Sequence, residues 1–568
     1  MALALAALYL TALDRPELLD PDESRHAEIA REMLDAGRFL TPRVYDEPYH
    51  DKPVGFHWAV VASLATVGHG TVAARMPAAL AALATLALTA WWAKRLHGED
   101  AASLAALGLG TSLLFVAIGR LATVDMLFTA LLTGAVAWLS VGLTEAPPRR
   151  RSMVPFYALV ALASLVKGPV AIVLVLPCLL VAHLSLRKRE TTGAWLRPLA
   201  GAAVILAIAG PWYAAAYHVD PEYVKAFLGL HNRDRFLGSD ALGHQRSLAY
   251  YALALPAALL PWTPLVIAGA LWRWRGRRAR SGADAVLWAW IASVALVFGA
   301  ASTRLVTYLL PAFPALFVAA ACGLLAEGHD AKSTHRRQIW VDRYATAWAG
   351  IVATATLAAA GIAKVSLGGM PGVGARSIFA SALALGSVAF VSQCVAKRRP
   401  SGAVLVLAVS SVVMVVGAYG PVADLLTAAK GYRALASELA AALPPDGVLS
   451  SLSRAPHALS FYLERPIGRV RDLAEARALL AGDAPVFLLT KPRYAGVLLD
   501  DEAAGIETWW RNAQGTTLVV NRAAASEWRR REGVEPSADL YGRQHGFEDR
   551  SGHRTRSLSA IEKSAVIP

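Results

Sequence analysis

A segment near the N-terminus carries the densest set of side chains that could do chemistry. It holds the acids Asp22 and Glu23, followed by the run Pro48-Tyr49-His50-Asp51-Lys52-Pro53. Further along the chain, charged residues such as Lys167 and Arg304 stand singly rather than in solubilising runs. Carboxylates can take a proton from a reacting group, and fixed cations can stabilise developing negative charge. Because lone ionisable residues beside long apolar stretches are costly, they are candidates for function.

The first acids begin a short helix, which the sequence predicts between Asp20 and Gly37. Asp20 can cap this helix, Pro21 suits its first position and Gly37 suits its C-terminal stop. One face is apolar and is expected to lie on the membrane surface; it consists of Ala27, Ala30, Met33 and Leu34. A structural role stays open for Asp22 and Glu23, because acids in a first helical turn complement the helix dipole and cap free N–H groups.

The composition is that of a membrane protein. Of 568 residues, 55% are hydrophobic and 17% are charged, whereas a soluble domain has about 25% charged residues. Apolar stretches long enough to cross a bilayer as helices recur as far as Asp424, and the alternation of a membrane barrel is absent. Cys178, Cys322 and Cys394 lie inside these stretches without metal-binding spacing. The predicted fold class is therefore an all-α polytopic membrane protein.

About thirteen transmembrane helices are predicted. They are residues 1–13, 72–95, 101–118, 121–143, 152–168, 169–186, 196–216, 249–272, 285–301, 305–326, 345–365, 376–396 and 402–424. The first is too short to span a membrane, so the true start is expected upstream. A cleaved signal peptide is the alternative, although its charged n-region and A-x-A site are missing.

Short basic clusters between the spans account for much of the net charge of +14 and all fall on one side, which should be the cytoplasm. They are Lys94-Arg95, Arg149–Arg151, Arg187–Arg189, Arg273–Arg280, Lys332–Arg343 and Lys397–Arg399. The opposite, outer side then receives the loops 14–70 and 217–248, the turn near Arg120, Lys167, Arg304 and everything after about residue 425.

The chain is predicted to divide into a transmembrane domain (1–425), a periplasmic α/β domain (426–525) and a flexible tail (526–568). Within the small domain, helix and strand signals alternate. The expected elements are helices at Lys430–Leu443 and Asp472–Ala481, and strands at Val448–Leu452, Pro485–Thr490 and Thr516–Asn521. The polar composition after residue 525 is typical of a disordered tail.

Several motifs, taken in order and on the same side, resemble a known family. They are Asp22-Glu23-Ser24-Arg25, Ala27–Met33, Pro48–Pro53, Gly119–Met126, Lys167-Gly168-Pro169, Pro211-Trp212-Tyr213 and Ser302 through Tyr308–Pro311. Over about residues 1–330 the chain resembles the C-type (GT-C) membrane glycosyltransferases. The most similar branch is that of the lipid A aminoarabinose transferases and their relatives, the protein mannosyltransferases.

The resemblance implies a sugar donor linked to a polyprenyl phosphate, and transfer outside the cytoplasm. Such a donor enters from the bilayer, so its phosphate must meet cations at the outer boundary. Loss of the polyprenyl phosphate builds negative charge, which cations fixed in place stabilise. The candidate ligands of the donor phosphate are Arg25, Lys52, Lys167, Arg235 and Arg304. For Lys52, snorkelling at the interface is the structural alternative.

By the same resemblance, Asp22 is the leading catalytic carboxylate and Asp125 the second essential acid. A hydroxyl acceptor needs a base to take its proton, whereas a phosphate acceptor is already ionised and leaves the acids to orient groups or balance charge. Pairing with Arg120 at a helix start is the alternative for Asp125. The other residues expected in the pocket are Glu23, Tyr49, Arg120 and Tyr308.

The loop 217–248 carries His231 and Arg235, which the resemblance brings to face the first loop. In some members of the family a metal joins a first-loop acid to this histidine, and here the acid would be Asp51. A divalent metal such as zinc is thus the one cofactor considered, although zinc normally takes four ligands. Local hydrogen bonding of His231 is the alternative.

The sequence departs from the family pattern at three positions. His50 replaces an aromatic residue, Val54 replaces a proline and Arg304 replaces a lysine. These differences leave the identity of the sugar and of the acceptor open, but they do not change the predicted class of reaction.

The predicted function is that of an inverting glycosyltransferase. It moves a sugar, such as aminoarabinose or mannose, from a polyprenyl-phosphate donor to lipid A, another glycolipid or a protein on the outer face of the bacterial inner membrane. The main alternative is a multi-span transporter or flippase of a lipid-linked sugar, whose charged residues would lie nearer the bilayer midplane. An oligosaccharide polymerase or ligase is disfavoured by the order of the motifs.

Overall fold

A computed structural model describes most of the chain. The described residues are 2–45, 47–144, 153–187, 195–227, 247–276, 281–326, 335–336, 339–348, 350–351, 407–409, 412, 423, 426–427, 431–444, 447–452, 455–500, 505–511 and 516–532. Within them the protein is mostly helical, with strands confined to one short hairpin and to a five-stranded sheet near the C-terminal end.

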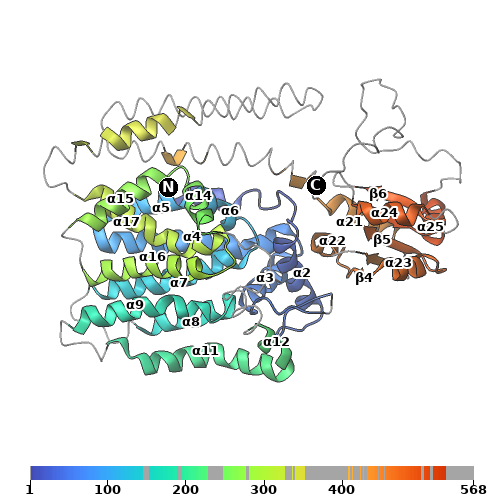
Figure 1. Ribbon diagram of the computed structural model, residues 1–568, viewed down its shortest axis with the longest axis horizontal. Helices are drawn as coiled ribbons and strands as arrows, with labels where there is room; N and C mark the ends of the chain where they lie inside the picture. Colours follow the sequence, from blue (N-terminus) through green and yellow to red (C-terminus); the bar gives the residue numbers. More distant parts are fainter. Residues whose placement is uncertain are drawn as a thin grey trace, which may run out of the picture.

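The helices between residues 71 and 325 lie side by side as an elongated bundle (Figure 1). They are α4 (Thr71–His97), α5 (Glu99–Gly110), α6 (Leu113–Gly119), α7 (Val124–Gly142), α8 (Met153–Lys167), α9 (Val170–Arg187), α11 (Pro198–Val219), α14 (Ala249–Ala258), α15 (Thr263–Arg275), α16 (Gly282–Ala300), η4 (Val306–Ala312) and α17 (Phe313–Leu325). Helix α1 (Ala2–Leu10) packs against α4.

Five of the described helices are long and apolar enough to cross a membrane: α4, α7, α11, α16, and η4 together with α17. Two bent pairs would raise the number to seven. The predicted span 101–118 is divided into α5 and α6 with a bend of 68°, and the predicted span 249–272 into α14 and α15 with a bend of 106°. Most of the predicted spans 345–365, 376–396 and 402–424 lies outside the described residues, so the number thirteen stays a prediction.

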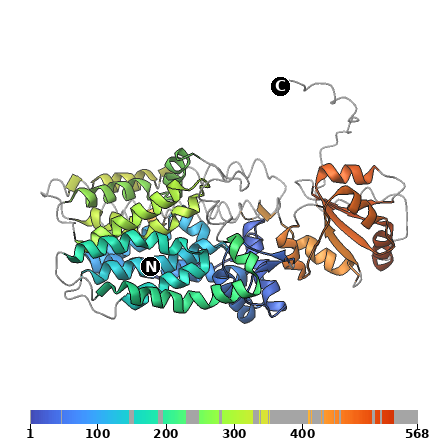
Figure 2. The same cartoon turned by 60° about the horizontal axis from the view of Figure 1, so that its bottom comes forward.

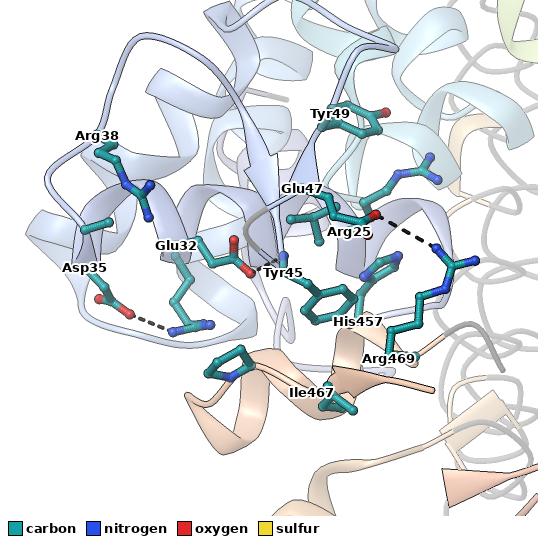
Figure 3. Close-up of a pocket in the computed structure, with 16 residues that line it drawn as sticks. Arg25, Glu32, Asp35, Arg38, Tyr45, Glu47, Tyr49, His457, Ile467 and Arg469 are labelled. Atoms are coloured by element: carbon teal, nitrogen blue, oxygen red, sulfur yellow. Dashed lines mark hydrogen bonds and ion pairs between the residues drawn. The ribbon is translucent and has the colours of Figure 1, made fainter. Parts of the chain in front are cut away.

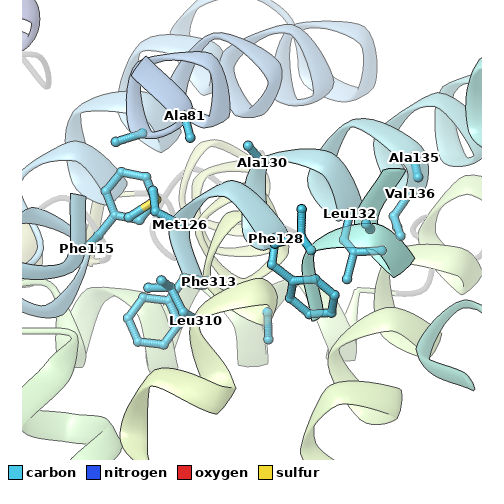
Figure 4. Close-up of a cluster of buried hydrophobic side chains, with 14 of the residues drawn as sticks. Ala81, Phe115, Met126, Phe128, Ala130, Leu132, Ala135, Val136, Leu310 and Phe313 are labelled. Carbon is cyan, nitrogen blue, oxygen red and sulfur yellow. The ribbon is translucent and has the colours of Figure 1, made fainter. Parts of the chain in front are cut away.

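Helix α7 forms the centre of the bundle. Apart from the start of the helix, its side chains are buried almost all round, as expected of a helix with packed neighbours on every side. Met126, Phe128 and Leu132 project from it among side chains of α4, α6, η4 and α17 (Figure 4). Because these neighbours fix α7 in place, they also fix the turn that precedes it.

The first outer segment folds at one end of the bundle. It contains α2 (Asp22–Asp35), a hairpin of β1 (Arg43–Val44) and β2 (Glu47–Pro48), and α3 (Gly55–Val67). Helix α12 (Pro221–Ala226) lies at the same end (Figure 1). As predicted, α2 stops just before Gly37, whose φ of +62° is readily adopted by glycine.

Two predictions about α2 are wrong. Asp20 does not cap the helix, because its Oδ1 accepts hydrogen bonds from the Ser24 hydroxyl and the N–H of Ala458. The apolar face was expected on the membrane surface, yet Ala27, Ala30 and Met33 are buried. Leu34 is only partly buried. Because α2 packs between α3 and a helix from the C-terminal end, protein rather than lipid covers this face.

The C-terminal residues form a mixed sheet flanked by helices, at the far right in Figure 2. The strand order is β4-β3-β5-β7-β6, with β3 parallel to β4 and β5, and β7 antiparallel to β5 and β6. The strands are β3 (Val448–Ser451), β4 (Gly468–Arg469), β5 (Val486–Thr490), β6 (Glu507–Arg511) and β7 (Thr517–Val520). The helices are α21 (Arg433–Ala442), α22 (His457–Leu463), α23 (Leu473–Leu480), α24 (Pro492–Leu499) and α25 (Arg522–Glu532). The predicted strands starting at Val448, Pro485 and Thr516 correspond to β3, β5 and β7.

Polar contacts tie this C-terminal unit to the first outer segment. The Ser460 hydroxyl donates to Glu28 over 2.6 Å, and the N–H of Leu18 donates to the Tyr462 hydroxyl over 2.8 Å. Glu17 accepts hydrogen bonds from the backbone of Tyr432 and Arg433. Helices α22 and α21 therefore hold the start of the outer segment against the bundle.

A buried ion pair organises the irregular chain between α1 and α2. Glu23 (3% exposed) and Arg75 (0% exposed) approach within 2.6 Å. The Arg75 guanidinium also donates to the carbonyls of Leu13, Pro16 and Glu17. The Glu23 carboxylate accepts from the N–H groups of Leu19 and Ala122. One pair thus joins α4, the entry to α2 and the turn before α7.

This geometry predicts that Arg75→Met strongly destabilises the fold. The substitution leaves Glu23 charged in a buried site and removes donors from several carbonyl groups, at a cost of about 3–5 kcal/mol. Thermal unfolding in detergent should show a much lower midpoint. Lys94→Met is the matched control, because Lys94 pairs with Glu99 in an exposed position and such pairs contribute about 1 kcal/mol or less. Equal midpoints for the two variants would contradict this prediction.

Candidate functional site

The predicted outer residues meet at the end of the bundle where α2 and α3 begin. Glu23 at the start of α2 accepts a 2.9 Å hydrogen bond from the N–H of Ala122, two residues before α7. The start of α3 lies against the end of α8, since a Cβ added to Gly55 would stand 2.7 Å from the Leu165 carbonyl oxygen. The Tyr223 hydroxyl of α12 donates to the Lys52 carbonyl over 2.6 Å. Segments far apart in the sequence are thereby brought to one place.

The first group of charges lies on α2 and on the loop after β2. Asp22 (77% exposed) pairs with Arg25 over 2.6 Å. The Arg25 guanidinium stands 5.2 Å from the centre of the Tyr49 ring, and the Tyr49 hydroxyl donates to Asp51 over 3.2 Å. Asp51 in turn pairs with Lys52 over 3.0 Å. The Lys52 ammonium is thus engaged by a carboxylate of the protein.

The second group is the ion pair between Asp125 at the start of α7 and Lys167 at the end of α8. The Lys167 ammonium faces three aromatic rings, with 5.1 Å to Phe128, 5.9 Å to Phe298 and 5.0 Å to Tyr308. The aromatic faces stabilise the Lys167 cation in addition to its carboxylate partner. The sequence motifs therefore correctly brought Asp125, Lys167 and Tyr308 to one end of the bundle.

Arg120 has a different role from the one considered for it. Its guanidinium donates to the carbonyls of Leu8, Thr11 and Ala12, at the end of α1. The alternative in which Asp125 pairs with Arg120 is therefore wrong, because α1 takes the guanidinium and Lys167 takes the carboxylate. Arg120 thus anchors the end of the N-terminal helix, and its predicted place in the pocket stays a prediction.

The remaining candidates are placed only in part. Arg304, between α16 and η4, donates to the Gly299 carbonyl over 2.9 Å. Glu23 belongs to the structural pair with Arg75. Arg235 and His231 lie outside the described residues, so their predicted roles stay predictions.

A buried histidine pair is a feature that the sequence analysis missed. His26 Nδ1 and His57 Nε2 lie 3.1 Å apart, and both rings are buried. Tyr49 packs edge-on against both histidines, at 6.2 Å from His26 and 6.0 Å from His57. His26 directly follows Arg25, and His57 lies in the first turn of α3, five residues after Lys52. The pair therefore joins α2, which carries Arg25, to α3, which begins three residues after Lys52.

Burial keeps this pair uncharged. It lowers the pKa of His57 to about 3 and the pKa of His26 well below its usual value, and the neighbouring Arg25 and Lys52 act in the same direction. Burial has the opposite effect on a carboxyl group, and it raises the pKa of Asp20 to about 6. An uncharged histidine pair adds no further positive charge beside the two cations.

The described part of the site fits a metal ion poorly. Both oxygens of Asp51 are engaged, Oδ1 by Lys52 and Oδ2 by Tyr49. Among the residues that the structure describes, no three histidine, cysteine or acidic side chains cluster as metal ligands. A metal shared between Asp51 and His231 stays a prediction, and no chemical step is assigned to it.

Comparisons with known proteins agree with the expected resemblance. Residues 51–214 match the family model of dolichyl-phosphate-mannose-protein mannosyltransferase. The chain is 32% identical over 324 residues to the undecaprenyl phosphate-alpha-4-amino-4-deoxy-L-arabinose arabinosyl transferase of Edwardsiella ictaluri, covering 56% of this chain and 57% of that protein. It is 31% identical over 363 residues to the transferase of the same name from Aeromonas salmonicida, covering 62% of this chain and 63% of the relative. The alignments thus span less than two thirds of these relatives.

The fold extends the likeness over nearly the whole chain. The crystal structure of ArnT from Cupriavidus metallidurans bound to undecaprenyl phosphate superposes with a TM-score of 0.76, covering 92% of this chain and 97% of that one at 22% identity. The apo structure of the same protein gives a TM-score of 0.77. The resemblance to the C-type membrane glycosyltransferases is confirmed: the chain matches the mannosyltransferase family model over residues 51–214, and its fold is similar to that of ArnT.

Proposed function

We propose that this protein is an inverting glycosyltransferase that takes its sugar from a polyprenyl-phosphate donor. The acceptor is lipid A, another glycolipid or a protein on the outer face of the bacterial inner membrane. The observation that carries the proposal is the meeting of three cation–carboxylate pairs at one end of an apolar helical bundle: Arg25–Asp22, Lys52–Asp51 and Lys167–Asp125. A phosphate at the membrane boundary requires cations in this position.

The similar proteins support the donor class. The curated relatives are named as transferases of 4-amino-4-deoxy-L-arabinose from undecaprenyl phosphate, and the ArnT structure holds undecaprenyl phosphate. For this chain, the donor is proposed to be a sugar linked to undecaprenyl phosphate or a similar lipid. The sugar is aminoarabinose, mannose or a close relative.

The proposed topology places the site outside the cytoplasm. The basic clusters at the opposite ends of the spans favour that orientation. Thirteen spans would put residues 426–525 in the periplasm as a small α/β domain, with the tail 526–568 after it and the transmembrane domain 1–425 before it. The contacts of α22 with α2 are compatible with this arrangement.

The reaction proposed is a single displacement at the anomeric carbon. The bond from that carbon to the phosphate oxygen breaks, the electron pair leaves with the polyprenyl phosphate, and an acceptor oxygen forms the new bond from the opposite face. Arg25, Lys52 and Lys167 are proposed to hold the phosphate as its charge grows. Arg235 and Arg304 stay further candidates for that role.

The carboxylates are proposed to change partners when the donor binds. Arg25, Lys52 and Lys167 are each paired with an acid in the structure, so a bound phosphate competes with Asp22, Asp51 and Asp125 for the same donors. A carboxylate released from a cation holds a proton more readily. Asp22, exposed at the start of α2, is then the proposed base for a hydroxyl acceptor, and Asp125 the acid that positions Lys167.

The decisive experiment is to identify the product. Purified full-length protein is mixed with undecaprenyl-phosphate aminoarabinose or mannose and with lipid A, glycolipid or protein fractions, and the products are measured by mass spectrometry. We expect transfer of one sugar to one fraction. Asp22→Asn should lower the rate about 100-fold for a hydroxyl acceptor, the usual contribution of a positioned base.

The same protein reconstituted in vesicles distinguishes an enzyme from a transporter or flippase. A transporter would move a lipid-linked sugar across the bilayer at the same rate with Asn at position 22, and it would form no glycosylated product. That result would overturn the proposed function.

Competition between phosphate and carboxylate predicts opposite effects of substitutions at Lys167 and at Asp125, the two residues of the second ion pair. Lys167→Met should weaken binding of undecaprenyl phosphate about tenfold, or about 1.4 kcal/mol. Asp125→Asn should strengthen binding, because Lys167 no longer has a competing anion, yet it should slow transfer. Calorimetric titration and rate measurements check the two effects. Glu222→Gln is the control, since Glu222 belongs to an exposed pair at the same end of the protein; weaker binding by the Asp125 variant would contradict the idea.

The histidine pair predicts a specific dependence of stability on pH. The folded protein resists protonation at His26 and His57, so their contribution is complete above about pH 6.5 and is lost as the pH falls from there towards 3. Asp20, with a raised pKa, acts in the opposite direction. The double variant carrying His26→Phe and His57→Phe should therefore lose less stability on acidification than the wild type loses.

Thermal midpoints between pH 7.5 and pH 5 measure this difference. The wild-type curve should fall more steeply than that of the double variant as the pH decreases. His69→Phe serves as the control because His69 is exposed. Parallel curves for wild type and double variant would show that the buried pair does not resist protonation.

A further inference from the structure

A cleft separates the first outer segment from the C-terminal unit (Figure 3). Its volume is about 950 Å³, within the range of roughly 300–1,000 Å³ usual for small-molecule sites. One wall comes from α2 and the β1–β2 hairpin, and the other from α22, β4 and the residues between them. The proposed lipid-linked donor enters from the bilayer, so its binding does not account for a cleft of this volume between the first outer segment and the C-terminal unit.

The cleft reaches the site through shared residues. Arg25 and Tyr49 line it, and the same two side chains connect to Asp22 and Asp51. A molecule in the cleft would therefore approach the proposed reaction centre from the side of the C-terminal unit. A lipid-linked donor enters from the bilayer, so the two substrates would not compete for one entrance.

The charges of the lining are mixed rather than basic. Arg38 and Arg469 stand among the carboxylates of Glu32, Asp35 and Glu47. Arg31 is already engaged by Glu28 and Asp35, so it contributes little free positive charge. Asp35 is in turn engaged by Arg31, and Glu47 faces Arg469, so opposite charges in the lining largely balance and leave little excess positive charge for a ligand rich in phosphates. Hydroxyl groups suit the mixture better, because they donate to carboxylates and accept from guanidinium groups.

Flat rings complete the lining. Tyr45 is stacked on His457 with ring centres 5.3 Å apart, so one ring from each wall contributes to the same surface. At the edge, Glu47 and Arg469 are 3.9 Å apart and are about 70% exposed. An exposed pair of this kind holds the walls together weakly, so a ligand can part it.

We infer that this cleft binds the sugar headgroup of the acceptor and recognises it through hydroxyl groups rather than through phosphates. The inference rests on the proposed glycosyl transfer, and it assigns half of the acceptor site to the C-terminal unit. The contacts of Ser460 with Glu28 and of Tyr462 with Leu18 keep that half in register with α2.

Binding of defined sugars to the full-length protein in lipid nanodiscs tests the inference without requiring transfer. The probes are a β-1,6-linked glucosamine disaccharide, the same disaccharide phosphorylated at both ends, and a mannose disaccharide, each followed by saturation-transfer NMR and calorimetry. We expect at least one unphosphorylated probe to bind as tightly as the phosphorylated one or more tightly. Glu47→Ala and Arg38→Ala, both at exposed positions, should weaken that binding about tenfold.

Matched controls are Glu222→Ala on α12 and Arg477→Ala on α23, two exposed residues outside the cleft. If no probe binds, or if the cleft variants bind as the controls do, the cleft is not the acceptor site. Preference for the phosphorylated disaccharide would overturn recognition through hydroxyls.

Transfer assays test the same variants during the reaction. The cleft variants should raise the acceptor KM about tenfold and leave the donor KM unchanged. Sugar binding without any transfer would refute the proposed function but not the binding site.

Discussion

The ion pair between Glu23 and Arg75 is the contact on which the outer end of this protein depends. The chain from Leu13 to Leu19 has no regular structure, and its carbonyl and N–H groups are satisfied largely by these two side chains. The same carboxylate reaches the N–H of Ala122 and so sets the start of α7. Buried ions are stable only when their hydrogen bonds are complete. Because Glu23 and Arg75 need these backbone partners, the pair holds the irregular chain in one conformation.

Pairing also governs the charges nearer the surface. Arg25, Lys52 and Lys167 are each paired with a carboxylate, so the site avoids a concentration of positive charge beside lipid. Uncharged histidines and aromatic rings fill the space between them without adding charge. The donor phosphate, whose negative charge grows from one to two as the sugar leaves, can then be accepted by rearranging existing pairs, which costs less than burying new ions.

Much of this could be predicted from sequence, because apolar spans that alternate in direction determine which loops meet. Asp22, Lys52, Asp125 and Lys167 accordingly lie at one end. The choice of partners could not be predicted, since Asp125 pairs with Lys167 only through the packing of α7 on α8. Arg75 gave no spacing signal inside an apolar helix.

The departures from the predicted spans and surfaces have similar causes. Pro261 lies within the predicted span 249–272, and a proline there could have predicted the bend between α14 and α15. The apolar face of α2 resembled a membrane-surface helix because lipid and protein neighbours select the same residues. The positions of α3 and α22 against α2 distinguish them.

The docking of the C-terminal unit on the first loop also constrains how such proteins can diverge. Glu17, Leu18, Asp20 and Glu28 contact residues more than 400 positions away in the chain. A C-terminal unit taken from another lineage would not find these partners, so recombination between relatives should succeed only when both ends are inherited together. The chain ought therefore to evolve as one block, with changes near residue 20 accompanied by compensating changes near residue 460.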